Sequence, residues 1–299
     1  MKHLLLYFLL LAVGEVALSA PINIVAAENF YGTVAEQIGG TSVKVATILM
    51  NPHQDPHEFQ PDAATAKLVS NADILIFNGL GYDDWMERLL KVTRKPHRIV
   101  IRVADLIDAK SGANPHIWYD PNAIAALGTK IAEILGRPQA GVLFHKSMQP
   151  LYEKIAALKK RTSGLKVTAT EPLFGYMASA LGFVMLNSDY QFAMLNDTDP
   201  NFKQTADFEK SLTGKTAKIL FYNSQVTSPS TERMQALAMK CHIPIVGITE
   251  TQPLNAKNYV GWMLSELSEV ENALNIKSAI LDHQRISGGA HRETSRHPK

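Results

Sequence analysis

Short apolar runs alternate along the chain with longer stretches whose apolar residues recur at helical spacing. The apolar runs predict strands at Ile22–Ala26, Val43–Leu49, Ala72–Phe77, Arg98–Val103, Leu165–Thr170, Phe183–Leu186, Ala217–Tyr222 and Ile243–Thr249. The periodic stretches predict helices at Phe30–Ile38, Ala64–Ser70, Trp85–Val92, Asn122–Leu135, Phe174–Leu181, Ser230–Met239 and Asn258–Leu274. Strands that alternate with helices in this way are typical of βαβ proteins with parallel sheets.

The pattern falls into two halves that are joined by one long helical stretch. Gln139–Lys160 keeps a helical periodicity, and Pro150 within it is expected to kink the helix. We therefore predict an α/β fold of two lobes, each a small parallel sheet flanked by helices, joined by a long connecting helix. The predicted units are a signal peptide (1–20), an N-terminal α/β lobe (21–138), the connecting helix (139–164), a C-terminal α/β lobe (165–275) and a disordered tail (276–299).

The first twenty residues have the pattern of an export signal. Lys2 precedes an apolar run that ends near residue 13, and the small residues Ser19 and Ala20 follow it. A run of about ten apolar residues is too short to span a bilayer, which takes about 20. We expect cleavage near Ser19 or Ala20 and a periplasmic mature protein. Because the one cysteine of the chain is Cys241, we expect no lipid anchor.

The charge of the chain excludes an electrostatic case for nucleic acid. The formal net charge is +2, and the tail after residue 275 has five basic and two acidic side chains, a net +3. The first twenty residues are neutral overall, so subtracting the tail leaves residues 21–275 at −1. A nearly neutral body has no basic footprint. We expect a monomer with no nucleic-acid partner.

Four residues with metal-binding side chains lie in loops, and three of these loops directly follow a predicted strand. The four are His57, His116, Glu171 and Glu250, and the strands that precede His57, Glu171 and Glu250 end at residues 49, 170 and 249. Ligands of open parallel sheets bind beyond the carboxyl ends of the strands. Each residue alone has an ordinary alternative as a loop or helix-terminal side chain. Together they predict one site between facing lobes, with His57 favoured over His53 in the same loop.

The predicted ligand set determines which cations fit. Two neutral imidazoles and two carboxylates form an N2O2 set of net charge −2, which neutralises a divalent cation. Four-coordinate binding suits Zn²⁺, and a carboxylate that binds through both oxygens also suits Mn²⁺ or Fe²⁺. Glu171 favours oxygen-preferring ions, whereas intrinsic affinity favours zinc over manganese. We predict one divalent transition metal, Mn²⁺ or Zn²⁺ before Fe²⁺.

The candidate ligands lie in four motifs that resemble those of a known family. The motifs are Asp55-Pro56-His57-Glu58-Phe59, Asn114-Pro115-His116-Ile117-Trp118-Tyr119-Asp120-Pro121, Thr170-Glu171-Pro172-Leu173-Phe174-Gly175-Tyr176 and Ile248-Thr249-Glu250-Thr251. Over residues 22–275 the chain resembles the substrate-binding proteins of zinc- and manganese-uptake ABC transporters. This resemblance implies two α/β lobes, a metal held between them, and delivery of the metal to an ABC permease in the inner membrane.

The sequence departs from the family pattern after the predicted strand Ala217–Tyr222. Family members often have an acid there, whereas this chain has Asn223, with Gln225 nearby. We expect these amides to orient a ligand by hydrogen bonds. Zinc-specific members often have a long His- and Asp-rich loop before the second motif. The corresponding segment here, residues 106–113, is short and has no histidine, which argues against zinc.

Two other classes of protein use the same ligand types. A secreted metallohydrolase would leave one metal position open for an activated water and would need a general base. The sequence contains neither HExxH nor GxSxG. In a metal-stabilised adhesin, the metal would be purely structural. We predict instead a non-enzymatic periplasmic solute-binding component without catalytic residues or a bound organic cofactor, which captures a metal ion between its lobes.

Overall fold

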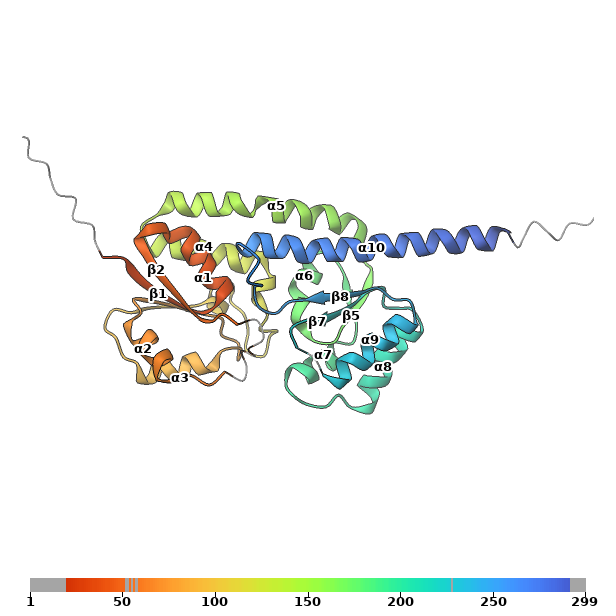
Figure 1. Ribbon diagram of the computed structural model, residues 1–299, viewed down its shortest axis with the longest axis horizontal. Helices are drawn as coiled ribbons and strands as arrows, with labels where there is room; N and C mark the ends of the chain where they lie inside the picture. Colours follow the sequence, from red (N-terminus) through yellow and green to blue (C-terminus); the bar gives the residue numbers. More distant parts are fainter. Residues whose placement is uncertain (1–19, 52–53, 55, 57–58, 227, 291–299) are drawn as a thin grey trace, which may run out of the picture.

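The computed structural model describes residues 20–51, 54, 56, 59–226 and 228–290. Two four-stranded sheets with only parallel pairing form the centres of two lobes (Figure 1). The first lobe contains β1 (Ile22–Glu28), β2 (Val43–Leu49), β3 (Ile74–Phe77) and β4 (Ile99–Arg102) in the order β2-β1-β3-β4. The second lobe contains β5 (Lys166–Ala169), β6 (Val184–Met185), β7 (Leu220–Asn223) and β8 (Ile245–Ile248) in the order β6-β5-β7-β8. The predicted α/β fold of two lobes is confirmed.

Helices cover the sheets of both lobes. They are α1 (Asn29–Gly39), α2 (Ala63–Asn71), α3 (Asp84–Val92), α4 (Pro121–Ile134), α5 (Pro138–Thr162), α6 (Gly175–Ala180), α7 (Ser188–Leu195), α8 (Phe202–Thr213), α9 (Pro229–Lys240) and α10 (Tyr259–Ala290). Short 3-10 helices lie at Gly40–Ser42, Val103–Ile107, Ile117–Tyr119 and Pro172–Phe174. In the described ranges, no helix has both the length and the apolar character that a membrane span requires.

The strand order is the same in the two lobes, and it fixes where a ligand crevice lies. In the first sheet β2 lies on one side of β1, and β3 and β4 lie on the other side. In the second sheet β6 and β7 flank β5 in the same way. The strand order therefore reverses between β1 and β3 and between β5 and β7. In open α/β sheets, ligands bind beyond the carboxyl ends of strands at such a reversal. Glu28 ends β1 and Asn223 ends β7, so both residues lie at these points.

One hydrophobic core continues from the first lobe into the second. The largest buried cluster contains residues from Ile24 in β1 to Leu274 in α10. Rings from distant segments meet in it: the centroid of Phe30 lies 4.8 Å from Trp118 and 5.7 Å from Trp262. Burying large aromatic rings is among the strongest contributions to a core. The lobes are therefore packed together rather than linked only by a tether.

Two long helices lie side by side, and Figure 1 shows that α5 runs along both lobes while α10 begins near their junction and runs along the second. Helix α5 connects the lobes and continues through Pro150. Lys154 and Arg161 of α5 both form ion pairs with Glu271 of α10. Helix α10 extends to Ala290, so residues 276–290, where the sequence predicts a disordered tail, are helical. The division of the chain into units at residues 138, 164 and 275 stays a prediction.

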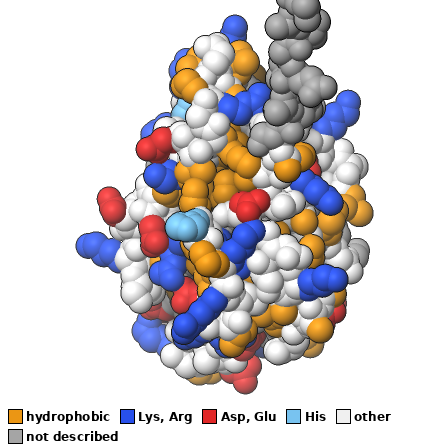
Figure 2. Space-filling model, turned by 90° about the vertical axis from the view of Figure 1, so that its left-hand side faces the viewer, with side chains coloured by type: hydrophobic (Ala, Val, Ile, Leu, Met, Phe, Trp, Pro, Cys, Tyr) orange, Lys and Arg blue, Asp and Glu red, His pale blue; other side chains and the backbone are white. Residues whose placement is uncertain are grey.

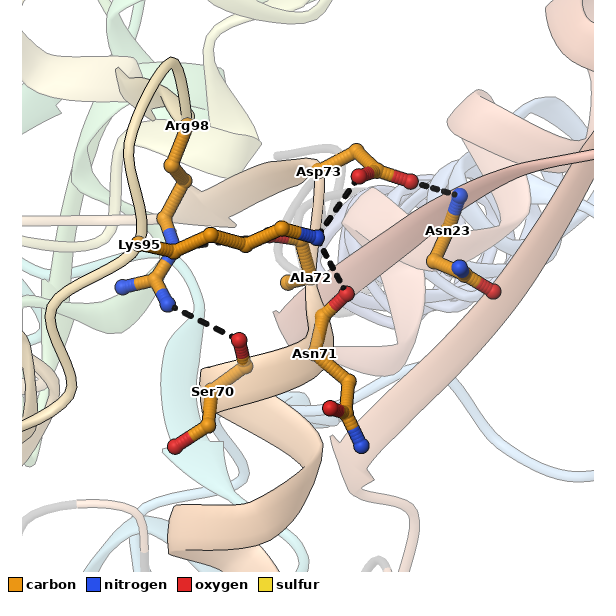
Figure 3. A network of polar contacts seen from close by, with 7 residues as sticks. All are labelled: Asn23, Ser70, Asn71, Ala72, Asp73, Lys95 and Arg98. Carbon is orange, nitrogen blue, oxygen red and sulfur yellow. Dashed lines mark hydrogen bonds and ion pairs between the residues drawn. The ribbon is translucent and has the colours of Figure 1, made fainter.

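The amino ends of the first sheet are closed by a polar network, shown in Figure 3. Asp73 accepts hydrogen bonds from the backbone N–H of Asn23 at 2.8 Å and from Lys95 Nζ at 2.7 Å. Arg98 reaches the carbonyl oxygen of Ser70 at 3.3 Å. These side chains hold the strand ends together.

Candidate metal centre

The structure describes three of the four predicted ligands, and His57 lies outside the described residues. His116 comes directly before the 3-10 helix Ile117–Tyr119 and is 1% exposed. Glu171 follows β5 and precedes the 3-10 helix Pro172–Phe174. Glu250 follows β8 and is 6% exposed. The two acids thus come from the carboxyl ends of strands in the second sheet, as the sequence predicts.

Asn223 brings the two acids together. Its Nδ2 donates to Glu250 Oε2 at 2.8 Å and to Glu171 Oε2 at 3.3 Å. One amide nitrogen has two hydrogens, so it satisfies both carboxylates at once. Asn223 itself is 1% exposed. Asn223 therefore forms hydrogen bonds with both candidate acids, and its role in orienting a ligand stays a prediction.

Tyr82 connects the first lobe to this acidic pair. The turn before α3 carries Tyr82, whose hydroxyl donates to Glu250 Oε1 at 3.0 Å. The Tyr82 ring also lies edge-on to His116, with centroids 6.1 Å apart. Burial, and the nearby charge of Glu250, raise the pKa of Tyr82 well above its ordinary value, so the phenol stays a neutral donor. Tyr82 thus links a histidine of one lobe with an acid of the other.

Asn114 fixes the orientation of the His116 ring. Its Nδ2 donates to the carbonyl oxygen of Pro172 at 2.6 Å, so its Oδ1 must act as an acceptor. That oxygen lies 2.6 Å from His116 Nδ1, which therefore carries a proton and leaves the lone pair on Nε2. Metal-binding histidines are commonly oriented in this way. Because Pro172 is next to Glu171, Asn114 also joins the two lobes.

The backbone on both sides of Glu250 is held by hydrogen bonds. Gln225 Oε1 accepts from the N–H groups of Glu250 and Thr251, both at 2.8 Å. The preceding residue, Thr249, donates its hydroxyl to Glu266 at 2.6 Å and accepts at its carbonyl from Tyr119 at 2.6 Å. The position of Glu250 is thus determined by groups from three different segments.

The three described residues are connected through Tyr82 and Asn223 rather than clustered directly. Among the described residues, no three histidine, cysteine, aspartate or glutamate side chains lie near enough together to hold a metal ion. Sequence reasoning missed Tyr82 and did not single out Asn114. For Asn114 a signal existed, because it lies two residues before His116 in the most specific motif. For Tyr82 none existed, because it is 168 residues from the acid that it contacts.

The first-lobe end of the molecule carries charges of both signs. Figure 2 shows acidic and basic side chains interspersed with apolar ones over this face. A nucleic-acid surface is expected to show basic residues clustered on one face. The face seen here has no such cluster.

A family model matches nearly the whole described chain. The model described as "Zinc-uptake complex component A periplasmic" matches residues 24–273. The manganese-binding lipoprotein MntA of Bacillus subtilis (strain 168) is 27% identical over 228 residues, which cover 70% of this chain and 73% of the relative. The iron ABC transporter substrate-binding lipoprotein MtsA of Streptococcus pyogenes serotype M1 is 23% identical over 287 residues, covering 85% and 90%.

A solved structure has the same fold. The periplasmic zinc-binding protein TroA from Treponema pallidum aligns with a TM-score of 0.71 at 16% identity, covering 85% of this chain and 99% of that chain. At this identity the likeness establishes the architecture alone. The two-lobed arrangement with a long helix across both lobes is thus shared with a solved protein.

Proposed function

Because the chain belongs to the family of the periplasmic component A of zinc-uptake complexes, the substrate-binding proteins of metal ABC transporters, we propose that it captures one divalent transition metal between its lobes. This family consists of binding components and not of enzymes, so the metallohydrolase and adhesin alternatives lose their support. The metal is cargo: it is bound and released, and no bond of a substrate is broken.

We propose His57, His116, Glu171 and Glu250 as the ligands. The observation that carries this assignment is the shared hydrogen bonding of Asn223 with both acids, together with the bridge that Tyr82 makes from Glu250 to His116. Two acids in contact with one neutral donor would repel each other without a positive charge. A divalent cation supplies that charge, and neutral Tyr82 and Asn223 orient the oxygens without competing for it.

The proposed cargo is Mn²⁺ or Zn²⁺. Two carboxylates and two imidazoles give an oxygen-rich set that suits manganese, whereas intrinsic affinity at such a site is higher for zinc. The names of relatives refer to manganese and to iron, and the family description refers to zinc. The partner that takes up the metal is an ABC permease of the inner membrane. We propose a monomer that is exported to the periplasm after cleavage near Ser19 or Ala20.

Metal analysis with matched variants tests this function. Elemental analysis of the mature protein, followed by competition between Zn²⁺ and Mn²⁺ at fixed pH, identifies the cargo. His116→Ala should lower affinity by orders of magnitude, because it removes a ligand that the fold has oriented. His145→Ala is the matched control, because His145 is on α5 and contacts Thr129. Equal affinity of both variants and the wild type would remove His116 from the site.

The affinity should also depend on pH. A metal binds neutral imidazole, so protons compete with it as the pH falls below about 6.5. Calorimetric titrations at pH 5.5 and 7.5 should show weaker binding at the lower value. A pH-independent affinity over this range would contradict histidine ligation.

A further inference from the structure

Glu28 is a buried acid that the proposed metal site does not use. It ends β1, at the point where the strand order of the first sheet reverses, and its side chain is 0% exposed. Among the described residues, no donor reaches either of its carboxylate oxygens. Although Glu28 precedes α1 as its N-cap residue, its side chain forms no cap hydrogen bond. A lone buried carboxylate of this kind costs several kcal/mol if ionised, so it takes up a proton or a partner.

The partner of Glu28 is a second buried acid, Asp83. Asp83 is also 0% exposed, and its charge raises the pKa of Glu28. Because Ala26 of β1 pairs with Ile76 of β3, the end of β1 lies beside Asn78, whose backbone N–H donates to Asp83. Unlike Glu28, Asp83 accepts two backbone hydrogen bonds, from the N–H of Asn78 at 2.5 Å and from the N–H of Gly79 at 2.8 Å. These donors stabilise the ionised form of Asp83. Of the two acids, Glu28 is therefore the one that holds the proton.

Among the described residues, no positive charge lies near enough to compensate either acid. Burial and Asp83 raise the pKa of Glu28 well above its ordinary value. The titratable groups that face the pair are Tyr31 from α1 and Tyr82 from the turn before α3, and burial keeps both phenols neutral. In the described part of the chain, the main causes of the raised pKa values of Glu28 and Asp83 include no lysine, arginine or histidine. A single proton between the acids is the arrangement with the least buried charge.

The acid pair supports the turn from which the metal site is built. Asp83 holds the backbone of Asn78, whose Nδ2 donates to the carbonyl oxygen of Pro115 at 2.8 Å. Pro115 directly precedes His116. Tyr31 donates to Asn78 Oδ1 at 2.6 Å and so fixes the orientation of that amide. Tyr82, which reaches Glu250, is the residue next to Asp83. The turn from Asn78 to Asp83 therefore touches both the histidine loop and the acid of the second lobe.

We propose that Glu28 is a neutral acid that donates its proton to Asp83, and that this acid–carboxylate pair positions the Asn78 turn and, through it, His116. Glu28 and Asp83 are thus positioning residues that do not touch the metal. The positioning role rests on the function proposed above. The shared proton is independent of that function, because Glu28 and Asp83 can share it whether or not a metal is bound.

Infrared spectroscopy of the metal-free protein tests the proton directly. At pH 7 the wild type should show the carbonyl stretch of a protonated carboxylic acid, and Glu28→Gln should remove the component of that band that belongs to Glu28. Glu266→Gln is the control, because Glu266 is a buried acid outside the pair whose pKa burial also raises. The band should persist at least in part in Glu266→Gln. A spectrum that Glu28→Gln leaves unchanged would overturn the proposal.

Metal titrations of three variants test the positioning role. Glu28→Gln keeps a neutral donor for Asp83 and should bind Mn²⁺ with an affinity within about twofold of the wild type. Glu28→Ala and Asp83→Ala break the pair and should weaken binding by about tenfold or more. The positioning role would be overturned if Glu28→Ala bound Mn²⁺ as tightly as the wild type. It would also be overturned if Glu28→Gln lost as much affinity as Glu28→Ala. If Asp83→Ala fails to fold, the two Glu28 variants still decide the question.

The two proposals can fail separately. If the wild type binds neither Mn²⁺ nor Zn²⁺, the proposed function and the positioning role both fail, while the infrared band still decides whether Glu28 is protonated. If the wild type binds metal but shows no infrared band from Glu28, the proposed function is supported and the proposal of a proton shared by Glu28 and Asp83 is wrong.

Discussion

Two neutral side chains organise the charged ones at the candidate site. Asn223 contacts Glu171 and Glu250, and Tyr82 contacts Glu250 and the ring of His116. Neutral donors suit this position, because a cation such as lysine would compete with the cargo for the acids. At the position where family members often have an acid, Asn223 therefore supplies a hydrogen-bond donor to two acids. A third acid there would repel them.

Replacing Asn223 should weaken metal binding without unfolding the protein. Among the described residues, Asn223 donates hydrogen bonds to both acids, and Asn223→Ala removes them, so we expect a loss of about tenfold in affinity. Asn196→Ala is the matched control, because its amide only caps the end of α7. Calorimetric titration with Mn²⁺ measures both variants. Equal affinities would show that Asn223 has no role in the site.

Sequence motifs identify the ligand candidates better than they identify the residues around them. His116, Glu171 and Glu250 are recognisable because each occurs in a short motif, and the local structure around each can be predicted from that motif. Tyr82 and Glu28 have no such motif, because their contacts join segments that only the three-dimensional fold brings together. The closeness of Tyr82 to Glu250 depends on how the two lobes pack, which no local pattern encodes.

At the scale of elements, the two edges of the first sheet have different tasks. Polar side chains at the amino edge, around Asp73, hold strands and a loop together, whereas the turn that follows β3 at the carboxyl edge carries Tyr82, which contacts Glu250. The Lys95 side chain and the backbone of Asn23 lower the pKa of Asp73 by hydrogen bonding to it. Its stabilising contribution is therefore present above its ordinary pKa of 3.8 and is lost as the pH falls below that value.

Asp73→Ala should separate stability from function. Asp73 is 43% exposed, so solvent screens its ion pair, and we expect a loss of at most about 1 kcal/mol in the free energy of unfolding. Denaturant unfolding at pH 7 should show this loss, and at pH 3 the difference should shrink. Affinity for Mn²⁺ should be unchanged. A weakened affinity would mean that the amino edge communicates with the site.

Glu266 is the acid that holds the end of β8 in place. It accepts from Thr249 Oγ1 at 2.6 Å and from Trp262 Nε1 at 3.1 Å. Burial raises the pKa of Glu266, so the folded protein keeps this proton at pH values where the unfolded chain has released it. The free energy of unfolding should therefore fall as the pH rises above 4.5, the ordinary value, and through the raised pKa.

Two substitutions of Glu266 should give opposite results. Glu266→Gln keeps an acceptor and removes the titrating group, so it should flatten the pH dependence and preserve metal affinity. Glu266→Ala leaves Thr249 and Trp262 without their acceptor and should cost about 2 kcal/mol of stability. Because Thr249 precedes Glu250, it should also weaken metal binding. Thermal unfolding between pH 4 and 8 checks both, and an unchanged slope in Glu266→Gln would contradict this account.

The order of strands and helices follows from the sequence pattern, and the exceptions have physical reasons. Helices α7 and α8 were not predicted. Helix α7 has no apolar stripe on one face, and its buried residues, Tyr190 and Gln191, are adjacent in sequence. Helix α8 begins with a capping box of Asn201 and Gln204, a signal that is readable in the sequence. The strand predicted from Ala217 begins only at Leu220.

At the scale of the whole molecule, many contacts cross between the lobes around Glu250. Asn29 of α1 exchanges two hydrogen bonds with the backbone of Gln252, at 2.7 and 3.2 Å. Tyr259 donates to the carbonyl oxygen of Trp118 at 2.8 Å. The segment after β8 thus follows the second sheet in the chain but is attached to the first lobe. These hydrogen bonds oppose a separation of the two lobes.

The protein should therefore unfold as one unit and change shape little when it binds metal. The hydrophobic core is continuous across the lobes, and α5, which runs along both, packs against α10. Calorimetry of the metal-free protein should give one transition, with equal calorimetric and van't Hoff enthalpies. Small-angle scattering should show nearly the same radius of gyration with and without Mn²⁺. Two separate transitions, or a large compaction on binding, would mean that the lobes behave as independent domains and that the bonds around Gln252 do not hold them together.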